Sequence, residues 1–184
     1  MDGLQERVRK LGGILDVAKA LVAERDLDRL LKLIVLAASR VVEADRCSLF
    51  LVDRARNELW SKVAQGVGTR EIRFAMGKGI AGTVAQTDRA VNIPDAYADR
   101  RFNPDVDKET GYRTRSILCV PILDRGRRPF AVMTLLNKCG GEPFDARDEQ
   151  SLAEFAASIG VILETWNETS KTRRARTPAG AAAR

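Results

Sequence analysis

Two pairs of strand-like segments, each joined by a short polar turn, constrain the fold of this 184-residue chain more than any other feature. Residues 46–52 and 58–64 alternate apolar and polar side chains on either side of a charged turn. Residues 116–123 and 129–137 are expected to form a second hairpin around the turn Asp124-Arg125-Gly126-Arg127. Strands joined by such short turns pair antiparallel. The sequence therefore predicts an antiparallel sheet built on two hairpins.

Helical periodicity replaces the strand pattern at both ends of the chain. Apolar residues near the N-terminus follow a heptad spacing that Gly12 and Gly13 interrupt: Leu4, Val8, Leu11, Leu15, Ala18 and Val22. This seam predicts a short amphipathic helix that either lies on its own domain or pairs with a second copy in a dimer. Asp26 is expected to cap a second helix over residues 27–42, and a last helix is expected over residues 145–166.

The segment between the two hairpins contains short elements and one long excursion. Short strands are expected over residues 71–74 and 91–93, with a brief helix over 81–86 between them. Residues 95–114 are predicted to be a long structureless segment, and such segments usually have a function. The order of elements predicts an α+β fold, in which one antiparallel sheet has helices on one face and the excursion on the other. The expected divisions are a helix over 1–25, a globular domain over 26–168 and a tail over 169–184.

Composition excludes several classes of function. Histidine is absent, which excludes His-based acid–base catalysis and His-ligated haem or zinc sites. Residues 169–184 contribute all but one unit of the net charge of +6, so a solvated basic linker is expected there. The rest of the chain is nearly neutral, so no nucleic-acid partner is expected. Cys47, Cys119 and Cys139 are too widely spaced for a disulfide framework or a metal knuckle. No apolar run is long enough to span a membrane, and we expect a cytoplasmic protein without metal or cofactor.

The excursion and the preceding glycine-rich turn carry residues suited to a small anionic heterocycle. Gly77, Gly79 and Gly82 allow close backbone approach, and a helix that begins near Ile80 would point free N–H groups at the same space. Lys78 adds a positive charge. Hydrogen-bonding groups and apolar cover for a flat ring come from the remaining candidates: Asp107, Thr110, Arg113, Thr114, Ile80, Ala81 and Tyr97. The alternative interpretation is that the glycines form a tight turn and the threonines cap turns.

Several segments together resemble a GAF domain, over about residues 27–166. The first predicted strand reads Ala-Asp-Arg-Cys-Ser-Leu-Phe-Leu-Val-Asp over residues 44–53, and Gly-Ile-Ala-Gly follows at 79–82. Residues 92–97 and 110–122 continue the family's order. The motif of the subclass found in cyclic-nucleotide phosphodiesterases and class III adenylyl cyclases is matched by Asn137, Lys138, Phe144, Asp148 and Glu149.

This resemblance implies a regulatory module and not an enzyme. It implies a homodimer formed through terminal helices, a pocket for cAMP or cGMP under the excursion, and a signalling output domain in cis or in trans. Carried over by position, the expected ligand-binding residues are Ser48, Ala64, Gln65, Ile80, Ala81, Asn103, Asp107, Thr110, Thr114 and Thr134. Three of them depart from the nucleotide-binding pattern. Ala64 stands where an aromatic residue often covers the base, Asn103 where a tyrosine can occur, and Thr134 where a glutamate can face the ligand.

The resemblance also leaves two alternatives open. One is a GAF dimerisation module that binds another small ligand or none. The other is a free methionine sulfoxide reductase, an enzyme of the same fold that uses pocket cysteines. Cys47 and Cys119 lie in predicted strands, where buried structural thiols are the more usual finding. The resemblance further implies a salt bridge between Lys138 and Asp148, which we interpret as a structural link beside the pocket.

Overall fold

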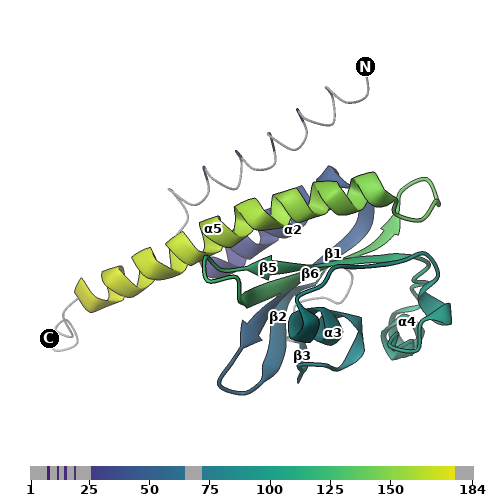
Figure 1. Cartoon of the computed structure of the whole chain (residues 1–184), viewed down its shortest axis with the longest axis horizontal. Helices are drawn as coiled ribbons and strands as arrows, with labels where there is room; N and C mark the ends of the chain where they lie inside the picture. Colours follow the sequence, from purple (N-terminus) through teal and green to yellow (C-terminus); the bar gives the residue numbers. More distant parts are fainter. Residues whose placement is uncertain are drawn as a thin grey trace, which may run out of the picture.

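Within the residues that the structure describes, six strands form an antiparallel sheet in the order β3-β2-β1-β6-β5-β4, which confirms the predicted α+β fold (Figure 1). The computed structural model describes residues 8, 12, 15, 19, 26–64 and 72–176, with side chains omitted for 62–64 and 167–176. The strands lie within two residues of their predicted bounds: β1 (Ala44–Asp53), β2 (Glu58–Ala64), β3 (Ile72–Ala75), β4 (Val91–Ile93), β5 (Ile117–Leu123) and β6 (Pro129–Lys138).

Two helices cover one face of this sheet. They are α2 (Leu27–Val41) and α5 (Ala146–Arg176), which run across the strands in one layer (Figure 1). The Asp26 carboxylate caps α2 as expected, accepting a hydrogen bond from the Asp28 backbone N–H at 2.9 Å. The buried stripe of α2 packs with α5 residues and with alternate strand residues such as Leu49 and Met133. This face of the sheet is sealed by apolar side chains.

The C-terminal helix is longer than the sequence predicts. The prediction ended it at Trp166 and placed a linker from residue 169, whereas α5 continues to Arg176. Residues 167–176 contain neither glycine nor proline, and the first breaker is Pro178. Lysine and arginine are good helix formers, and they also suit the negative end of the helix dipole. The basic charge that indicated a linker is therefore compatible with the last turns of the helix.

The opposite face of the sheet carries the excursion. The helix predicted before it, α3 (Gly79–Thr87), lies on the same face. Within residues 95–114 the structure has the 3-10 turn η1 (Ala96–Ala98) and the helix α4 (Asp105–Thr110), so the expectation of a structureless segment is wrong. A second apolar cluster packs here, with Phe50, Val84 and Val132 among its buried members. Because side chains alternate along a strand, Cys47 and Leu49 face the helices while Ser48 and Phe50 face the excursion.

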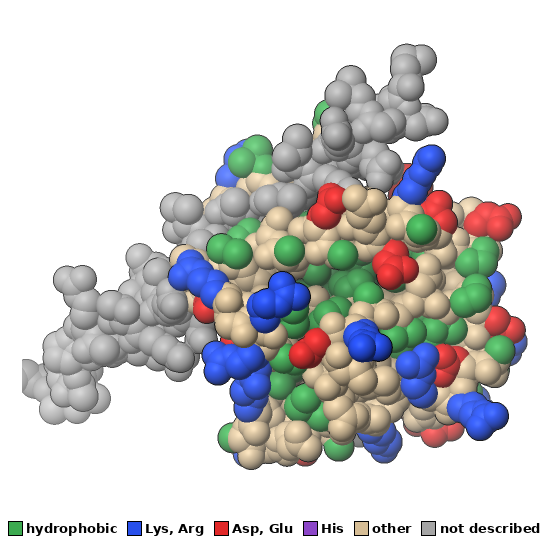
Figure 2. Space-filling model, viewed as in Figure 1, with side chains coloured by type: hydrophobic (Ala, Val, Ile, Leu, Met, Phe, Trp, Pro, Cys, Tyr) green, Lys and Arg blue, Asp and Glu red, His purple; other side chains and the backbone are tan. Residues whose placement is uncertain are grey.

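The predicted N-terminal helix over 1–25 lies mostly outside the described residues. Val8 and Leu15 of its heptad seam are described, are helical and are 62% and 53% exposed. The tail after Arg176 also lies outside the described residues. In the part of the chain that is described, no helix is long and apolar enough to cross a membrane, and no group of metal-ligating side chains occurs. Figure 2 shows acidic and basic side chains both present across the visible face of the folded domain.

Candidate functional site

A cavity of about 390 Å³ lies between the sheet and the excursion, and we call it the α3–α4 cavity. Its volume falls within the range of small-molecule sites, about 300–1,000 Å³. The strands supply its floor, the first turn of α3 supplies one wall and α4 supplies another. Eight of the residues expected from the sequence line it: Ser48, Ile80, Ala81, Asn103, Asp107, Thr110, Thr114 and Thr134. Chain segments far apart in sequence therefore converge on one space.

The other two expected residues are placed only in part. Ala64 lies opposite Ser48 in the β1–β2 register, and its side chain is not described. Gln65 lies outside the described residues. Tyr97 and Arg113 are not among the residues that line the cavity; Arg113 stacks on the Tyr97 ring at 3.7 Å, and Tyr97 is 41% exposed. The expectation that Tyr97 covers a bound ring is therefore not met by this arrangement.

The N-terminus of α3 opens into the α3–α4 cavity. Gly79, Ile80 and Ala81 form the first helical positions and line the cavity, while Lys78 at the N-cap makes no side-chain capping bond. A capping side chain normally occupies the first free N–H groups of a helix. Gly79 has φ +70°, a conformation that favours glycine. The result is a helix end with N–H groups and a positive dipole directed at the cavity, which suits an anion.

Close backbone packing holds that helix end in place. A Cβ at Gly82 would lie 3.0 Å from the Gly77 nitrogen and 3.1 Å from the Ala75 oxygen, so only glycine fits there without a shift. The Gly77 N–H donates to the Gly82 carbonyl at 2.9 Å. The turn after β3 and the body of α3 are thus joined directly. The spacing of glycines in the sequence reflects this close approach.

Aromatic side chains form part of the apolar wall, and the sequence analysis missed them. The rings of Phe50 and Phe74 pack edge to face with centroids 5.1 Å apart, and both residues line the cavity with Phe102. Phe50 follows Ser48 by two positions, so the alternation along β1 placed it on the same face. These rings supply aromatic surface in a site where Ala64 does not. A flat heterocycle can bind against such a wall.

Basic side chains outnumber acidic ones around the cavity. Arg46, Arg73, Lys78 and Arg101 line it, against Asp107. The Arg101 guanidinium donates two hydrogen bonds to the Asp99 carboxylate, at 2.9 and 2.6 Å. These bonds hold the pKa of the Asp99 carboxyl below its usual range. Arg46 lies over the Tyr112 ring at 3.5 Å from its centroid. Arg73 also pairs with acids, Asp53 and Glu58, at 3.8 and 3.7 Å. The positive charge that favours an anionic ligand therefore comes mainly from Arg46 and Lys78.

Asp107 and Thr114 bond to each other as well as lining the cavity. The Asp107 carboxylate accepts hydrogen bonds from the Thr114 hydroxyl at 2.8 Å, the Thr114 N–H at 2.7 Å and the Tyr97 hydroxyl at 3.1 Å. Both residues are almost fully buried, at 6% and 1% exposed. Their shared bonds fasten α4 to the segment before β5. Asp107 and Thr114 therefore contribute to the site largely by holding α4 in place over the cavity.

Asn137 fastens the end of the excursion to β6. Its side-chain oxygen accepts from the N–H groups of Arg115 and Ser116 at 2.6 and 3.2 Å. Its side-chain nitrogen donates to the Arg113 carbonyl at 2.8 Å and to the Tyr112 hydroxyl at 2.9 Å. Asn137 has φ +53°, which asparagine tolerates better than most residues. One buried amide thus satisfies four groups of the excursion.

Tyr112 connects the hydrogen bonds of Asn137 to the start of β1. Its hydroxyl donates to the Asp45 carboxylate at 2.7 Å. Burial of the ring, together with the neighbouring Asp45 carboxylate, raises the pKa of Tyr112. The phenol therefore remains protonated and able to donate at neutral pH. The loop that covers the cavity is tied at this end to two strands.

The remaining motif residues join β6 to α5. Lys138 Nζ donates to the Asp148 carboxylate, which also accepts from the Asp145 N–H at 2.9 Å. Asp145 in turn accepts from the Asp148 N–H at 2.9 Å, forming a reciprocal cap at the start of α5, and this bond lowers the pKa of Asp145. Phe144 is buried in the helix-side core. Glu149 lies in the first turn of α5, where an acidic side chain suits the helix dipole. These residues lie outside the cavity lining.

The cysteines do not form a reactive set. Cys47 and Cys119 are fully buried, and burial raises the pKa of both thiols, to about 12 for Cys119. The Cys119 sulfur lies 3.2 Å from the Thr134 hydroxyl. Cys139 is exposed at the end of β6. Because the thiolate is the nucleophile, the two buried thiols are unsuited to cysteine chemistry near neutral pH.

Comparison with known proteins identifies the family to which the fold belongs. The family model of the GAF domain matches residues 26–163. The chain is 39% identical to a probable 3',5'-cyclic phosphodiesterase, pde-5, of Caenorhabditis elegans, over 90% of this chain and 24% of that protein. It is 38% identical to the dual 3',5'-cyclic-AMP and -GMP phosphodiesterase 11A of Takifugu rubripes, over 81% of this chain and 18% of that protein. The chain thus spans about a quarter or less of these relatives.

A solved structure agrees with the fold. It is the GAF domain of a phosphoenolpyruvate-protein phosphotransferase from Coxiella burnetii, with a TM-score of 0.74. The two chains are 20% identical, and the match covers 89% of this chain and 98% of the other. At that identity the likeness concerns the arrangement of the sheet and helices.

Proposed function

The chain belongs to the GAF domain family, and from that premise we propose that its α3–α4 cavity binds a cyclic nucleotide, cAMP or cGMP, as a regulatory ligand. We propose a regulatory rather than a catalytic role for this domain, because its two buried thiols are unsuited to cysteine chemistry near neutral pH. The relatives with the cited identities are named as cyclic phosphodiesterases, one of them acting on both nucleotides. Their names support the ligand class and leave the choice between the two nucleotides to experiment.

The observation that carries the proposal is the uncapped end of α3 in a basic, aromatic-walled cavity. The cyclic phosphate would accept hydrogen bonds from the N–H groups at Ile80 and Ala81, beside the Lys78 ammonium. The purine would bind against the Phe50 and Phe74 rings. A ligand held in this way contacts both the sheet and the excursion. Its binding would stabilise the closed arrangement of α3 and α4.

We further propose that the domain works as a homodimer that passes the signal to an output domain, in cis or in trans. The helices that cover the sheet expose large apolar side chains on their outer side: Leu33 and Leu36 of α2 and Val161 of α5 are 37%, 45% and 51% exposed. A second copy could cover this surface. The same helices are fastened to the cavity's cover through β6, because Asn137 and Lys138 are adjacent.

A melting-temperature titration of the purified protein tests ligand binding. The ligands to compare are cAMP, cGMP, 5'-AMP and free methionine sulfoxide. A ligand at 100 times its dissociation constant adds about 2.7 kcal/mol to the stability of the fold, which corresponds to several degrees. We expect a shift with a cyclic nucleotide and none with 5'-AMP. The proposal fails if no cyclic nucleotide shifts the transition of protein that mass spectrometry has shown to be free of copurified ligand.

A further inference from the structure

Two aspartates hold an arginine in nearly the same way at two different places in the domain. The Asp99 carboxylate accepts hydrogen bonds from the Arg101 backbone N–H at 2.9 Å and from its guanidinium at 2.9 and 2.6 Å. The Asp124 carboxylate accepts from the Arg128 backbone N–H at 2.9 Å and from its guanidinium at 3.0 Å. Hydrogen bonds from the arginine lower the pKa of each carboxyl, so both aspartates are ionised at neutral pH and each cancels an arginine charge.

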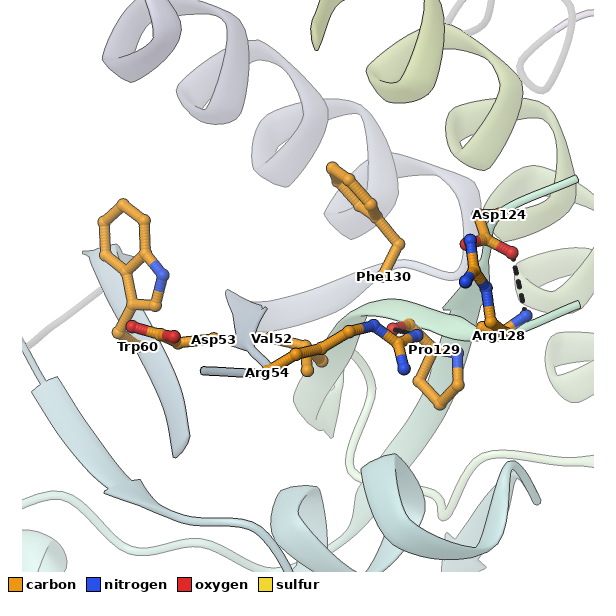
Figure 3. Close-up of a pocket in the computed structure, with 8 residues that line it drawn as sticks. All are labelled: Val52, Asp53, Arg54, Trp60, Asp124, Arg128, Pro129 and Phe130. Carbon is orange, nitrogen blue, oxygen red and sulfur yellow. Dashed lines mark hydrogen bonds and ion pairs between the residues drawn. The ribbon is translucent and has the colours of Figure 1, made fainter. Parts of the chain in front are cut away.

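The two pairs differ in what lies beside them. Arg101 lines the α3–α4 cavity, whereas Asp99 is not among the residues that line it. The Asp124–Arg128 pair spans the turn between β5 and β6 and lines a separate hollow of about 490 Å³, together with Phe130 (Figure 3). Neither residue of that pair lines the α3–α4 cavity. The pair at the turn therefore provides a matched comparison for the pair at the cavity.

Arg101 lies beside the end of α3 that we propose as the phosphate site. A Cβ placed on Gly79, the first residue of α3, would lie 3.8 Å from the Arg101 backbone oxygen. The Arg101 charge also reaches the sheet beneath the cavity: burial raises the pKa of the Cys119 thiol, and the hydrogen bond with Thr134 and the Arg101 charge oppose that rise. The Arg101 side chain is 37% exposed, so its position depends on the bond to Asp99 more than on packing.

The charge state of a phosphate decides how much it gains from a free Arg101. A cyclic nucleotide carries a phosphodiester with one negative charge, whereas a 5'-nucleotide carries a monoester that holds nearly two at neutral pH, because its second pKa is about 6. While Asp99 holds Arg101, the main sources of positive charge at the cavity are Arg46 and Lys78. A dianion gains more than a monoanion from each additional cation. Asp99 therefore acts against the dianion more strongly than against the monoanion.

We propose that Asp99 is a specificity-determining residue, which favours a cyclic nucleotide over a 5'-nucleotide by keeping the Arg101 guanidinium neutralised at the cavity. Asp99 acts through Arg101 and is a positioning residue. Specificity of this kind arises from an interaction withheld from the wrong ligand, and not from a contact added for the right one. The inference rests on the proposed binding of a cyclic nucleotide and adds to it a reason for excluding the noncyclic form.

The test variant is full-length Asp99→Asn, which removes the charge and keeps an oxygen that can accept from the Arg101 N–H. Asp124→Asn makes the same change in the matched pair outside the cavity. The double variant D99N/R101Q removes the arginine that the first substitution releases. Asp99→Ser, which also keeps an oxygen acceptor, replaces Asp99→Asn if that variant does not fold. Circular dichroism and melting curves check the folding of every variant.

Isothermal titration with cAMP, cGMP, 5'-AMP and 5'-GMP at pH about 8 measures the dissociation constants, and competition against bound cyclic nucleotide measures the weak ones. The quantity compared is the ratio of the dissociation constant of a 5'-nucleotide to that of its cyclic counterpart. A substitution that only disturbs the structure changes both constants alike and leaves the ratio unaltered. A repeat at higher salt tests the electrostatic origin, because screening reduces the effect.

We expect Asp99→Asn to lower this ratio about tenfold, because a released guanidinium binds a dianionic phosphate through charge-assisted hydrogen bonds. Asp124→Asn and D99N/R101Q should keep the wild-type ratio. An unchanged ratio in folded Asp99→Asn, with a wild type that binds a cyclic nucleotide, would overturn this inference and leave the proposed function standing. A ligand-free wild type that binds no cyclic nucleotide would overturn both.

Discussion

The two faces of the sheet use the same strands for different purposes. On the helix face, α2 and α5 seal a continuous apolar core in which Phe155 is 1% exposed. On the excursion face, the apolar cluster is smaller and leaves the α3–α4 cavity, whose cover is held by hydrogen bonds at Asp107 and Asn137. The difference suggests a division in which the helix face supplies most of the stability and the excursion face holds the proposed binding site. Substitutions on the two faces should therefore separate the two properties.

The largest effect is expected from the helix face. Phe155→Ala should lower the free energy of unfolding by about 3–5 kcal/mol, because it opens a cavity among packed side chains. Phe74→Ala, at a half-buried position of the cavity wall, should cost less stability. It should instead weaken nucleotide binding tenfold or more, by analogy with the ~1–3 kcal/mol of base–aromatic stacking. Urea denaturation measures the stability of both variants, and nucleotide titration measures their affinity. Equal losses of nucleotide affinity in Phe155→Ala and Phe74→Ala would contradict the separation of the two faces.

Asn137 is expected to affect both properties. Asn137→Ala should reduce stability by about 3 kcal/mol, since it leaves the buried Ser116 N–H and the part-buried Arg115 N–H without their acceptor. It should also release the excursion and reduce the nucleotide-induced melting shift. Asn137→Asp keeps the acceptor and loses the donor, so it should fall between the wild type and the alanine variant. A wild-type melting temperature for Asn137→Ala would refute the fastening role.

A smaller loss of stability is expected at the α4 fastening. Asp107→Ala should cost about 2 kcal/mol, because the buried N–H and hydroxyl of Thr114 lose their acceptor. The protein should remain folded and lose its nucleotide-induced stabilisation, and Thr114→Ala should do the same. Differential scanning calorimetry with and without ligand measures both quantities. Unchanged ligand stabilisation in both variants would show that α4 is not the cover of the binding site.

The smallest effect is expected from the cap of α5. The Asp148 N–H lowers the pKa of the Asp145 carboxyl in the folded protein, so the ionised cap is stabilising above the unfolded value of about 3.9 and is lost as the pH falls through the lower folded value. Asn can also cap a helix but does not titrate. The difference in melting temperature between the wild type and Asp145→Asn should therefore shrink as the pH falls from about 7 to about 3. A difference that stays constant with pH would contradict this assignment.

Local patterns predicted the strands and the helix face, and they did so for a physical reason. The pairing of β1 with β2 and of β5 with β6 depends on short turns, and the stripe of α2 depends on residues within a few turns of one another. The cavity's cover depends on distant partners instead. Tyr112 bonds Asp45, 67 positions away, and no local pattern contains that contact. The same limit explains why Tyr97 was expected over a bound ring and instead supports Asp107.

The residues of the candidate site were predicted mainly from the resemblance to the GAF family. That resemblance did not indicate the aromatic wall of the cavity. Eight expected residues do line the α3–α4 cavity, yet Phe50 and Phe74 were not anticipated as its aromatic wall. Strand alternation from Ser48 could have indicated Phe50. Phe74 could not be placed, because the register of β3 on β2 is a tertiary fact.

The measurement that tests the central claim most directly compares a cyclic nucleotide with its own nucleoside. Isothermal titration of the wild-type protein with cAMP and adenosine, and with cGMP and guanosine, isolates the contribution of the cyclic phosphate. If the end of α3 and Lys78 bind that phosphate, one cyclic nucleotide should bind at least about tenfold more tightly than its nucleoside. Equal affinities, or binding of neither compound to ligand-free protein, would contradict the assignment of the α3–α4 cavity as a cyclic-nucleotide site.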